Sequence, residues 1–154
     1  MDNLQAARTI FSVASLLESQ GANPYRVRAY RRAAFGMLVL PEQVNRYTTT
    51  DQELDLPWLG PRLRRKLGEL VTRGRMQFYD DLIAELPRAQ RELLSLPGVG
   101  PKTAQRLIDE LGIRSIRGLV RAARRGRLRR VRGIGRLRER RLAQAAEAMV
   151  AGAA

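Results

Sequence analysis

Apolar residues recur every three or four positions between residues 4 and 17, which is the spacing of one face of an α-helix. Gly21 is expected to end this helix. Asn23-Pro24 then begins a second helix, with asparagine as the N-cap and proline in the first turn, and this helix must stop before Pro41. The start of the chain therefore predicts two helices joined by a short turn.

The same pattern, with glycine and proline at the ends, predicts six further helices at about residues 61–72, 78–86, 89–95, 101–111, 115–124 and 136–150. No segment alternates between apolar and polar residues convincingly enough for a strand. The expected fold class is therefore all-α, with short loops between the helices.

Three segments repeat one short pattern, a tight apolar bend that ends in glycine, followed by a helix with a basic residue near its start. Residues 56–67 read LPWLGPRLRRKL, residues 96–107 read LPGVGPKTAQRL and residues 131–142 read VRGIGRLRERRL. The second and third bends are Gly-apolar-Gly, whereas Trp58 replaces the first glycine in the first bend. One such bend is most often a plain helix cap, but three in register indicate a functional repeat.

A Gly-apolar-Gly bend before a helix can bind an anion. The apolar residue plugs into the core, and the amide groups beside the second glycine join the positive end of the helix dipole. A basic residue one or two positions later can reach the same phosphate, which is a contact with the nucleic-acid backbone and not with bases. The residues expected to contact DNA are Gly98, Val99, Gly100, Lys102, Thr103, Arg129, Arg130, Gly133, Ile134, Gly135, Arg136 and Arg138.

The charge of the chain favours the same partner. The formal net charge is +14, and thirteen arginines but only one acidic residue, Glu139, lie between Arg114 and Arg141. Such a surplus predicts a polyanionic partner, nucleic acid first and an anionic membrane second. The chain has no cysteine and no histidine, which excludes disulfides, thiolate or histidine metal sites and Ser-His-Asp chemistry. Aromatic residues make up only 5%, too few for a base-stacking platform.

The order of these motifs resembles the N-terminal part of family X DNA polymerases, especially the bacterial members. The resemblance rests on the segment NPYRVRAYRRAA at residues 23–34, followed by the bends at residues 56–67 and 96–104, and it covers about residues 3–147. It implies a lyase-type domain like that of the polymerase beta group at residues 1–86, and a tandem helix-hairpin-helix domain that grips duplex DNA at residues 87–154.

The resemblance also implies roles for single residues. Arg26, Tyr30, Gly60 and Arg62 would hold the 5′-phosphate of a DNA gap, and Lys66 falls where some members form a Schiff base with an abasic sugar. A neutral amine is needed for that chemistry, and the arginines at positions 62, 64 and 65 are expected to lower the pKa of Lys66. The main-chain carbonyls of Leu94, Leu96 and Val99 would hold a sodium or potassium ion, and no other cofactor is required.

The polymerase palm of the family carries a Gly-Ser motif and paired aspartates, and neither Gly-Ser nor Asp-x-Asp occurs in this sequence. We therefore expect sequence-independent DNA binding in repair or replication, on duplex, gapped or nicked DNA. The alternatives are an abasic-site lyase using Lys66, a fragment of a longer polymerase, and a scaffold that pairs with another repair protein through its N-terminal helices. Without a leader or a long apolar segment, the expected location is the cytoplasm, at the nucleoid, with no membrane and no small-molecule substrate.

Overall fold

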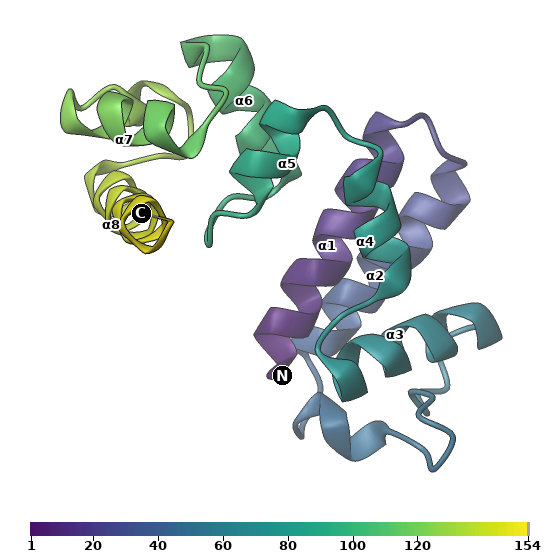
Figure 1. Cartoon of the computed structure of the whole chain (residues 1–154). Helices are drawn as coiled ribbons and strands as arrows, with labels where there is room; N and C mark the ends of the chain where they lie inside the picture. Colours follow the sequence, from purple (N-terminus) through teal and green to yellow (C-terminus); the bar gives the residue numbers. More distant parts are fainter. Residues whose placement is uncertain (154) are drawn as a thin grey trace. The chain divides into compact units, whose positions relative to one another are not determined.

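The computed structural model describes residues 1–153 of the chain, which divides into two compact units. The first unit is Met1–Glu85 and the second begins at Leu86. Within the described residues the fold is all-α, with eight α-helices, two short 3-10 helices and no strand (Figure 1). The all-α prediction is confirmed, and the division falls one residue from the domain boundary expected after residue 86.

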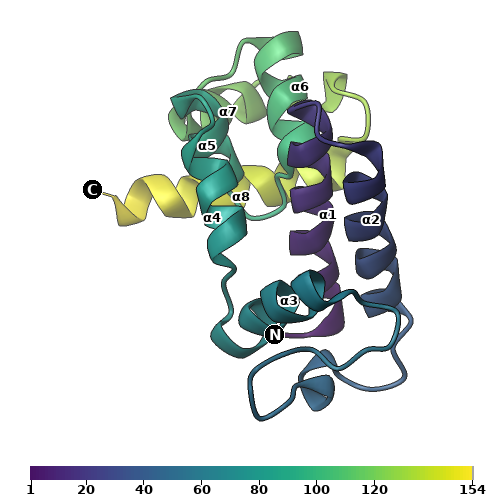
Figure 2. The same cartoon turned by 90° about the vertical axis from the view of Figure 1, so that its right-hand side faces the viewer.

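The first unit packs three helices along one another and a fourth across their ends. Its elements are α1 (Asn3–Ser19), α2 (Pro24–Leu38), η1 (Val44–Tyr47), α3 (Pro61–Arg73) and α4 (Gln77–Ala84). In Figures 1 and 2, α1 and α2 lie side by side and α3 crosses below them. The core residues with the largest buried side chains are Ile10, Met37, Leu54, Leu67, Leu70 and Met76.

Local sequence explains where these helices begin and end. Asp2 caps α1, because its carboxylate accepts from the amide of Gln5 at 2.7 Å while the Gln5 side chain accepts from the amide of Asp2 at 3.0 Å. Asn23 caps α2 as expected, accepting from the amide of Tyr25 at 2.9 Å. Gly74 ends α3 with a φ of 71°, in the left-handed region.

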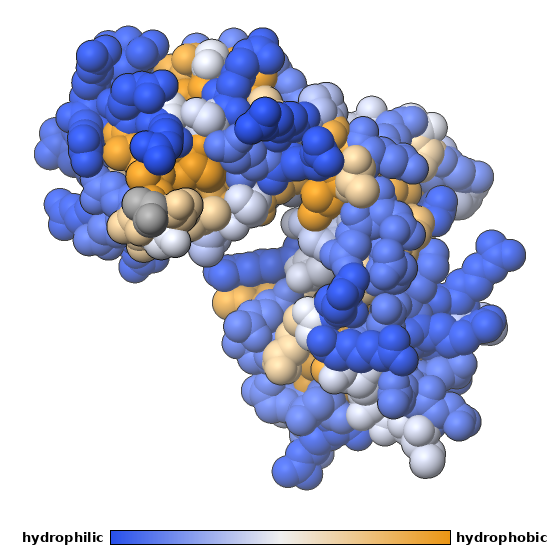
Figure 3. Space-filling model, viewed as in Figure 1, coloured by the Kyte–Doolittle hydropathy of each residue, from blue (hydrophilic) through white to orange (hydrophobic). Residues whose placement is uncertain are grey.

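The second unit consists of two hairpins of helices around one core. Its elements are α5 (Arg88–Leu94), α6 (Pro101–Leu111), α7 (Ile116–Arg124), η2 (Leu128–Arg130) and α8 (Arg136–Gly152). The centre of the core consists of Leu93, Leu96, Leu107, Leu119, Leu128 and Leu142, each no more than 2% exposed. In Figure 3, hydrophilic side chains cover most of the visible surface of this unit, with apolar patches between them.

The eight predicted helices all occur, and most ends agree within two residues. The helix expected at residues 78–86 ends at Ala84, because Leu86 precedes Pro87 and the residue before a proline is disfavoured in a helix. The two 3-10 helices and an isolated bridge between Thr48 and Leu54 were not predicted. No helix among residues 1–153 is long and apolar enough to cross a membrane.

Candidate nucleic-acid interface

The three repeated bends share one backbone skeleton. In each of them the residue just before the final glycine donates its amide to the carbonyl three positions earlier. The three bonds are Leu59 to Leu56 at 3.0 Å, Val99 to Leu96 at 3.1 Å and Ile134 to Val131 at 3.0 Å. The carbonyl of the final glycine then accepts from the fourth residue of the following helix, at 2.9 to 3.0 Å in all three bends. The repeat seen in the sequence is therefore a structural repeat.

The two bends of the second unit differ from the first at one position. Gly98 and Gly133 have φ of 88° and 89°, the left-handed conformation that the third residue of a type II turn requires. Trp58 stands at the same place in the first bend and does not have a positive φ. The first bend is therefore not a type II turn.

The apolar residue of each bend fixes it to the core. Val99 is 7% exposed and Ile134 is 4% exposed, so both side chains point into the second unit as the pattern predicts. Any contact of these two residues with a ligand is left to their main chain. The buried side chain therefore holds each bend against the core, next to the start of the following helix.

Gly100 and Gly135, the last residues of their bends, are open to solvent on the side that a ligand would approach. Each is the N-cap of its helix, and a Cβ added to either glycine would meet no atom within 4 Å. Within residues 1–153 their amides donate to no acceptor in the protein. Free amides at the positive end of a helix dipole form an anion-binding site.

A single guanidinium joins the two bends of the second unit. Arg138 donates to the carbonyl of Gly133 at 3.0 Å and, through Nη2, to the carbonyl of Gly98 at 3.1 Å and the hydroxyl of Thr103 at 3.2 Å. Arg106 adds a second link, donating to the carbonyl of Arg132 at 3.2 Å. Both bends therefore lie within reach of one side chain, on the same side of the unit, and α6 and α8 both begin there.

Of the arginines expected to contact DNA, two have partners inside the unit. Arg138 is used to join the bends, and Arg129 pairs with Glu139, its Nη2 and Nε lying 2.9 and 3.1 Å from Oε1. The main-chain amide of Arg129 donates to the other carboxylate oxygen at 3.1 Å. The remaining basic residues expected at the interface, Lys102, Arg130 and Arg136, are exposed.

A second group of predicted residues meets in the first unit, in a cavity of about 370 Å³. Lys66 lines it and lies with its Nζ 3.4 Å from the hydroxyl of Tyr30 and 3.7 Å from the centre of the Phe78 ring. Arg26 and Arg62 line the same cavity. Gly60, the N-cap of α3, is not among the lining residues.

Burial lowers the pKa of the Lys66 amine more than the neighbouring charges do. The pKa of Lys66 is lowered first by burial and then by the charges of Arg26 and Arg62. Arg64 and Arg65, which the sequence led us to expect as further causes, have carboxylate neighbours instead, Asp55 at 3.5 Å and Glu53 at 3.8 Å. Burial also raises the pKa of Tyr30, with Arg26 opposing that effect.

Two family models match the chain, and together they cover both units. The "SAM-like Helix-hairpin-helix tandem" model matches residues 90–148, and the "Helix-hairpin-helix domain" model matches residues 1–76. Each unit of the chain thus contains a segment that is similar to a helix-hairpin-helix model. The three repeated segments, at residues 56–67, 96–107 and 131–142, lie within the matched regions, and we call them the first, second and third hairpins.

The chain is also similar to a bacterial polymerase. It is 29% identical over 139 residues to the DNA polymerase/3'-5' exonuclease PolX of Bacillus subtilis (strain 168). The match covers 90% of the chain but only 24% of the polymerase, so the chain spans about a quarter of that relative's length. The resemblance to bacterial family X polymerases expected from the motifs is thereby confirmed.

Sequence analysis did not identify the ring of Phe78 as a neighbour of Lys66, nor the residue against which Trp58 packs. The half-buried ring of Phe78 lies under both Lys66 and Arg26, with its centre 4.9 Å from the guanidinium carbon of Arg26. Trp58 covers Gly36 of α2, where an added Cβ would lie 2.3 Å from the indole. Gly36 inside a helix was the available signal, because a glycine there usually marks a close approach.

Proposed function

We propose that this chain binds DNA through its phosphate backbone, independently of base sequence, in DNA repair or replication. The observation that carries the proposal is the pair of open helix starts at Gly100 and Gly135, held on one side of the second unit by Arg138. The helix-hairpin-helix matches and the similarity to a DNA polymerase support DNA as the partner. Exposed Lys102, Arg130 and Arg136 would add charge around the two sites.

The first test replaces the open glycines. Gly100 and Gly135 have φ of −95° and −89° with ψ near 180°, so valine fits their backbone, yet its side chain would fill the space of a bound phosphate. The variant G100V/G135V should keep its thermal unfolding but bind any duplex about tenfold more weakly. Gly152→Val is the matched control, because Gly152 is also open but lies at the far end of α8. Equal affinity of both variants would reject the hairpins as the binding site.

Salt dependence tests the contact with the backbone. If about six phosphates are neutralised, the logarithm of the binding constant should fall with the logarithm of salt concentration at a slope of about −5. A slope near zero would exclude binding through phosphates. We would also compare binding to duplex DNA, nicked DNA, gapped DNA and duplex RNA at one salt concentration. Binding to RNA, or no binding to any of the four, would favour the scaffold hypothesis instead.

A lyase activity of Lys66 is the second candidate, favoured by the cavity that it shares with Arg26 and Arg62. The neutral amine would add to the aldehyde of an abasic deoxyribose and lose water to give an imine, with the two guanidinium groups holding the 5′-phosphate. Tyr30, which accepts a hydrogen bond from Lys66, would orient the amine.

Borohydride trapping on DNA with an abasic site tests this activity. The natural chain should give a covalent adduct, and Lys66→Arg should give none because arginine keeps the charge but cannot lose its proton. Lys102→Arg, the change of the other lysine, is the control and should still be trapped. An adduct that persists in Lys66→Arg would reject Lys66 as the nucleophile.

A sodium or potassium ion on the main-chain carbonyls of Leu94, Leu96 and Val99 remains part of the proposal. Leu94 is the last residue of α5, where helix carbonyls lack partners within the helix. Within residues 1–153 the carbonyl of Leu96 accepts one hydrogen bond, from the amide of Val99, which leaves its second lone pair for a cation. Replacing potassium with a bulky quaternary ammonium ion at the same ionic strength should weaken DNA binding if the ion contributes. Unchanged binding would remove the ion from the proposal.

A further inference from the structure

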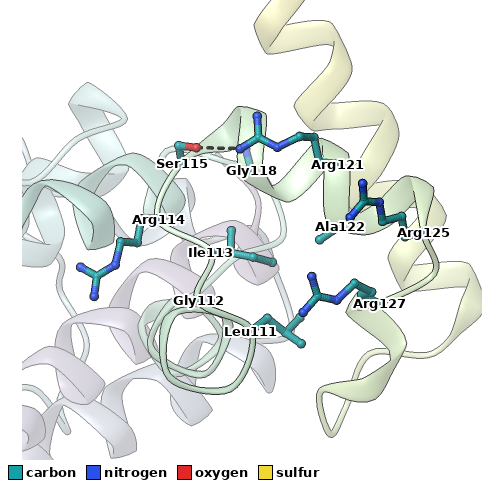
Figure 4. Close-up of a pocket in the computed structure, with 10 residues that line it drawn as sticks. All are labelled: Leu111, Gly112, Ile113, Arg114, Ser115, Gly118, Arg121, Ala122, Arg125 and Arg127. Carbon is teal, nitrogen blue, oxygen red and sulfur yellow. Dashed lines mark hydrogen bonds between the residues drawn. The ribbon is translucent and has the colours of Figure 1, made fainter.

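Four arginines line a cavity that lies outside the hairpin bends. Arg121, on α7, and Arg125 and Arg127, in the turn after it, border a cavity of about 340 Å³ (Figure 4). Leu111, Ile113 and Ala122 provide its apolar lining. Arg114 also borders the cavity, but in Figure 4 its side chain extends away from the other three. We call Arg121, Arg125 and Arg127 the α7 cluster.

The α7 cluster has no acidic residue to balance it. No aspartate or glutamate lines the cavity, and within residues 1–153 none of the three side chains makes a hydrogen bond or ion pair. The neighbouring Arg124, by contrast, lies 3.4 Å from Glu147 and is paired with it. Like charges held together without a partner repel one another, and a bound polyanion relieves that repulsion.

The cavity lies at the opposite end of α6 from the hairpin bend. Gly100 is the residue before α6, and the cavity is lined by Leu111, Gly112 and Ile113 at the other end. Eleven residues at the α-helical rise separate the two by about 16 Å. Because Arg138 bridges the second and third bends, the third bend, at Gly133, also lies near the start of α6, away from the cavity.

The direction of α6 decides which nucleic acid the α7 cluster can reach. If the start of α6 points at a phosphate, as the proposed function requires, the helix extends away from that duplex. The far end of α6 then lies on the side of the unit that the first duplex leaves free. We propose that the α7 cluster binds the phosphate backbone of a second DNA segment, so that the second unit bridges two segments. This inference rests on the proposed DNA binding by the hairpins.

A capture experiment tests bridging with the full chain. A short duplex is fixed to beads, and the protein must hold a second, fluorescent duplex on them. R121A/R125A/R127A should capture about tenfold less of the second duplex, while its affinity for a single duplex in solution stays close to that of the natural chain. R8A/R32A/R73A is the control with the same loss of charge, on exposed arginines of the first unit, and should capture normally.

Two results would overturn the inference. Capture that is equal in the cluster variant and the control variant would show that the α7 cluster is not used for bridging. A loss of single-duplex affinity as large as the loss of capture would place the cluster on the same duplex as the hairpins. The proposed function fails separately: the natural chain would then not bind even a single duplex, or G100V/G135V would bind it as well as the natural chain.

Discussion

The first and second hairpins of this chain keep the same hydrogen bonds but use their bends differently. In the second hairpin Gly98 adopts a left-handed φ, and the open glycine that follows leaves amides facing solvent. In the first hairpin Trp58 occupies the same place without a positive φ and covers Gly36 of α2. Shared backbone hydrogen bonds therefore do not determine the role of a bend, because one side chain changes what the bend contacts.

The polar groups near the two bends also differ: they are side chains in the first unit and main-chain amides in the second. The first unit gathers side chains near its hairpin, with Arg26, Arg62 and Lys66 lining one cavity. The second unit gathers main-chain groups, at Gly100 and Gly135, and uses Arg138 to hold them in place. The first arrangement suits a reaction at one phosphate end, and the second suits repeated contacts along a backbone.

Glu139→Ala is expected to have the largest effect that differs between the two units, because it should destabilise the second unit and leave the stability of the first unchanged. The carboxylate is 5% exposed and accepts three bonds from Arg129, so its removal leaves the amide of Arg129 without an acceptor next to the third hairpin. Because the side chain of Arg129 is 44% exposed and can be rehydrated, the cost should be about 2 kcal/mol, less than for a fully buried pair. Hydrogen exchange measured in both units should show faster opening in the second unit and no change in the first.

Gly98→Ala tests whether the left-handed φ distinguishes the second hairpin. The new Cβ would lie 3.4 Å from Leu142, an ordinary contact, so the cost comes from the φ of 88° and should be about 1–2 kcal/mol. Gly100→Ala, two residues later, has an unstrained φ of −95° and is the control for stability. Urea unfolding of the two variants should therefore differ. Equal midpoints would mean that the bend relaxes to a turn like that of the first hairpin.

Gly36→Ala tests the packing that is special to the first hairpin. Its Cβ would lie 2.3 Å from the indole of Trp58, so the ring must move, and because Trp58 is 46% exposed the loss of stability should be about 1 kcal/mol. Trp58 is the only tryptophan, so its fluorescence emission should shift to longer wavelength. Gly60→Ala, where the added Cβ meets nothing within 4 Å, should leave the emission unchanged.

The sequence predicted the helices and the repeat because both depend on local signals. Apolar spacing, Asn23 as a cap and glycine at the bends act over a few residues, and each is visible in one stretch of chain. Partners far apart in sequence were not predictable in this way. Arg138 binds Gly98 forty positions earlier, so an arginine expected to contact DNA serves to join the hairpins.

The cavity lined by Lys66 likewise combines features that the sequence predicted with features that depend on tertiary packing. The positions of Lys66, Arg26 and Arg62 were expected from the resemblance, and the fold places them around one cavity. The ring of Phe78 beneath Lys66 was not expected, because α4 reaches this cavity only through the packing of the first unit. The main cause of the lowered pKa of Lys66 was missed for the same reason, since burial depends on the tertiary structure.

The smallest expected effect concerns the reactivity of Lys66. Because its pKa is lowered, a larger share of the amine is neutral at a given pH, so modification by an amine-specific reagent should reach its half-maximal rate at a lower pH than for a free lysine. Phe78→Ala should move this midpoint back towards higher pH, because exposure of the amine to water outweighs the loss of the contact between the ammonium and the ring 3.7 Å from Nζ. Phe35→Ala is the control, a change of a 60% exposed ring outside the lining of the cavity.

Mass spectrometry resolves Lys66 from Lys102, the only other lysine, in the same sample. A midpoint equal to that of free lysine would remove the physical basis for a lyase, whereas a shift that Phe78→Ala leaves unchanged would assign the lowered pKa to Arg26 and Arg62 instead of to burial.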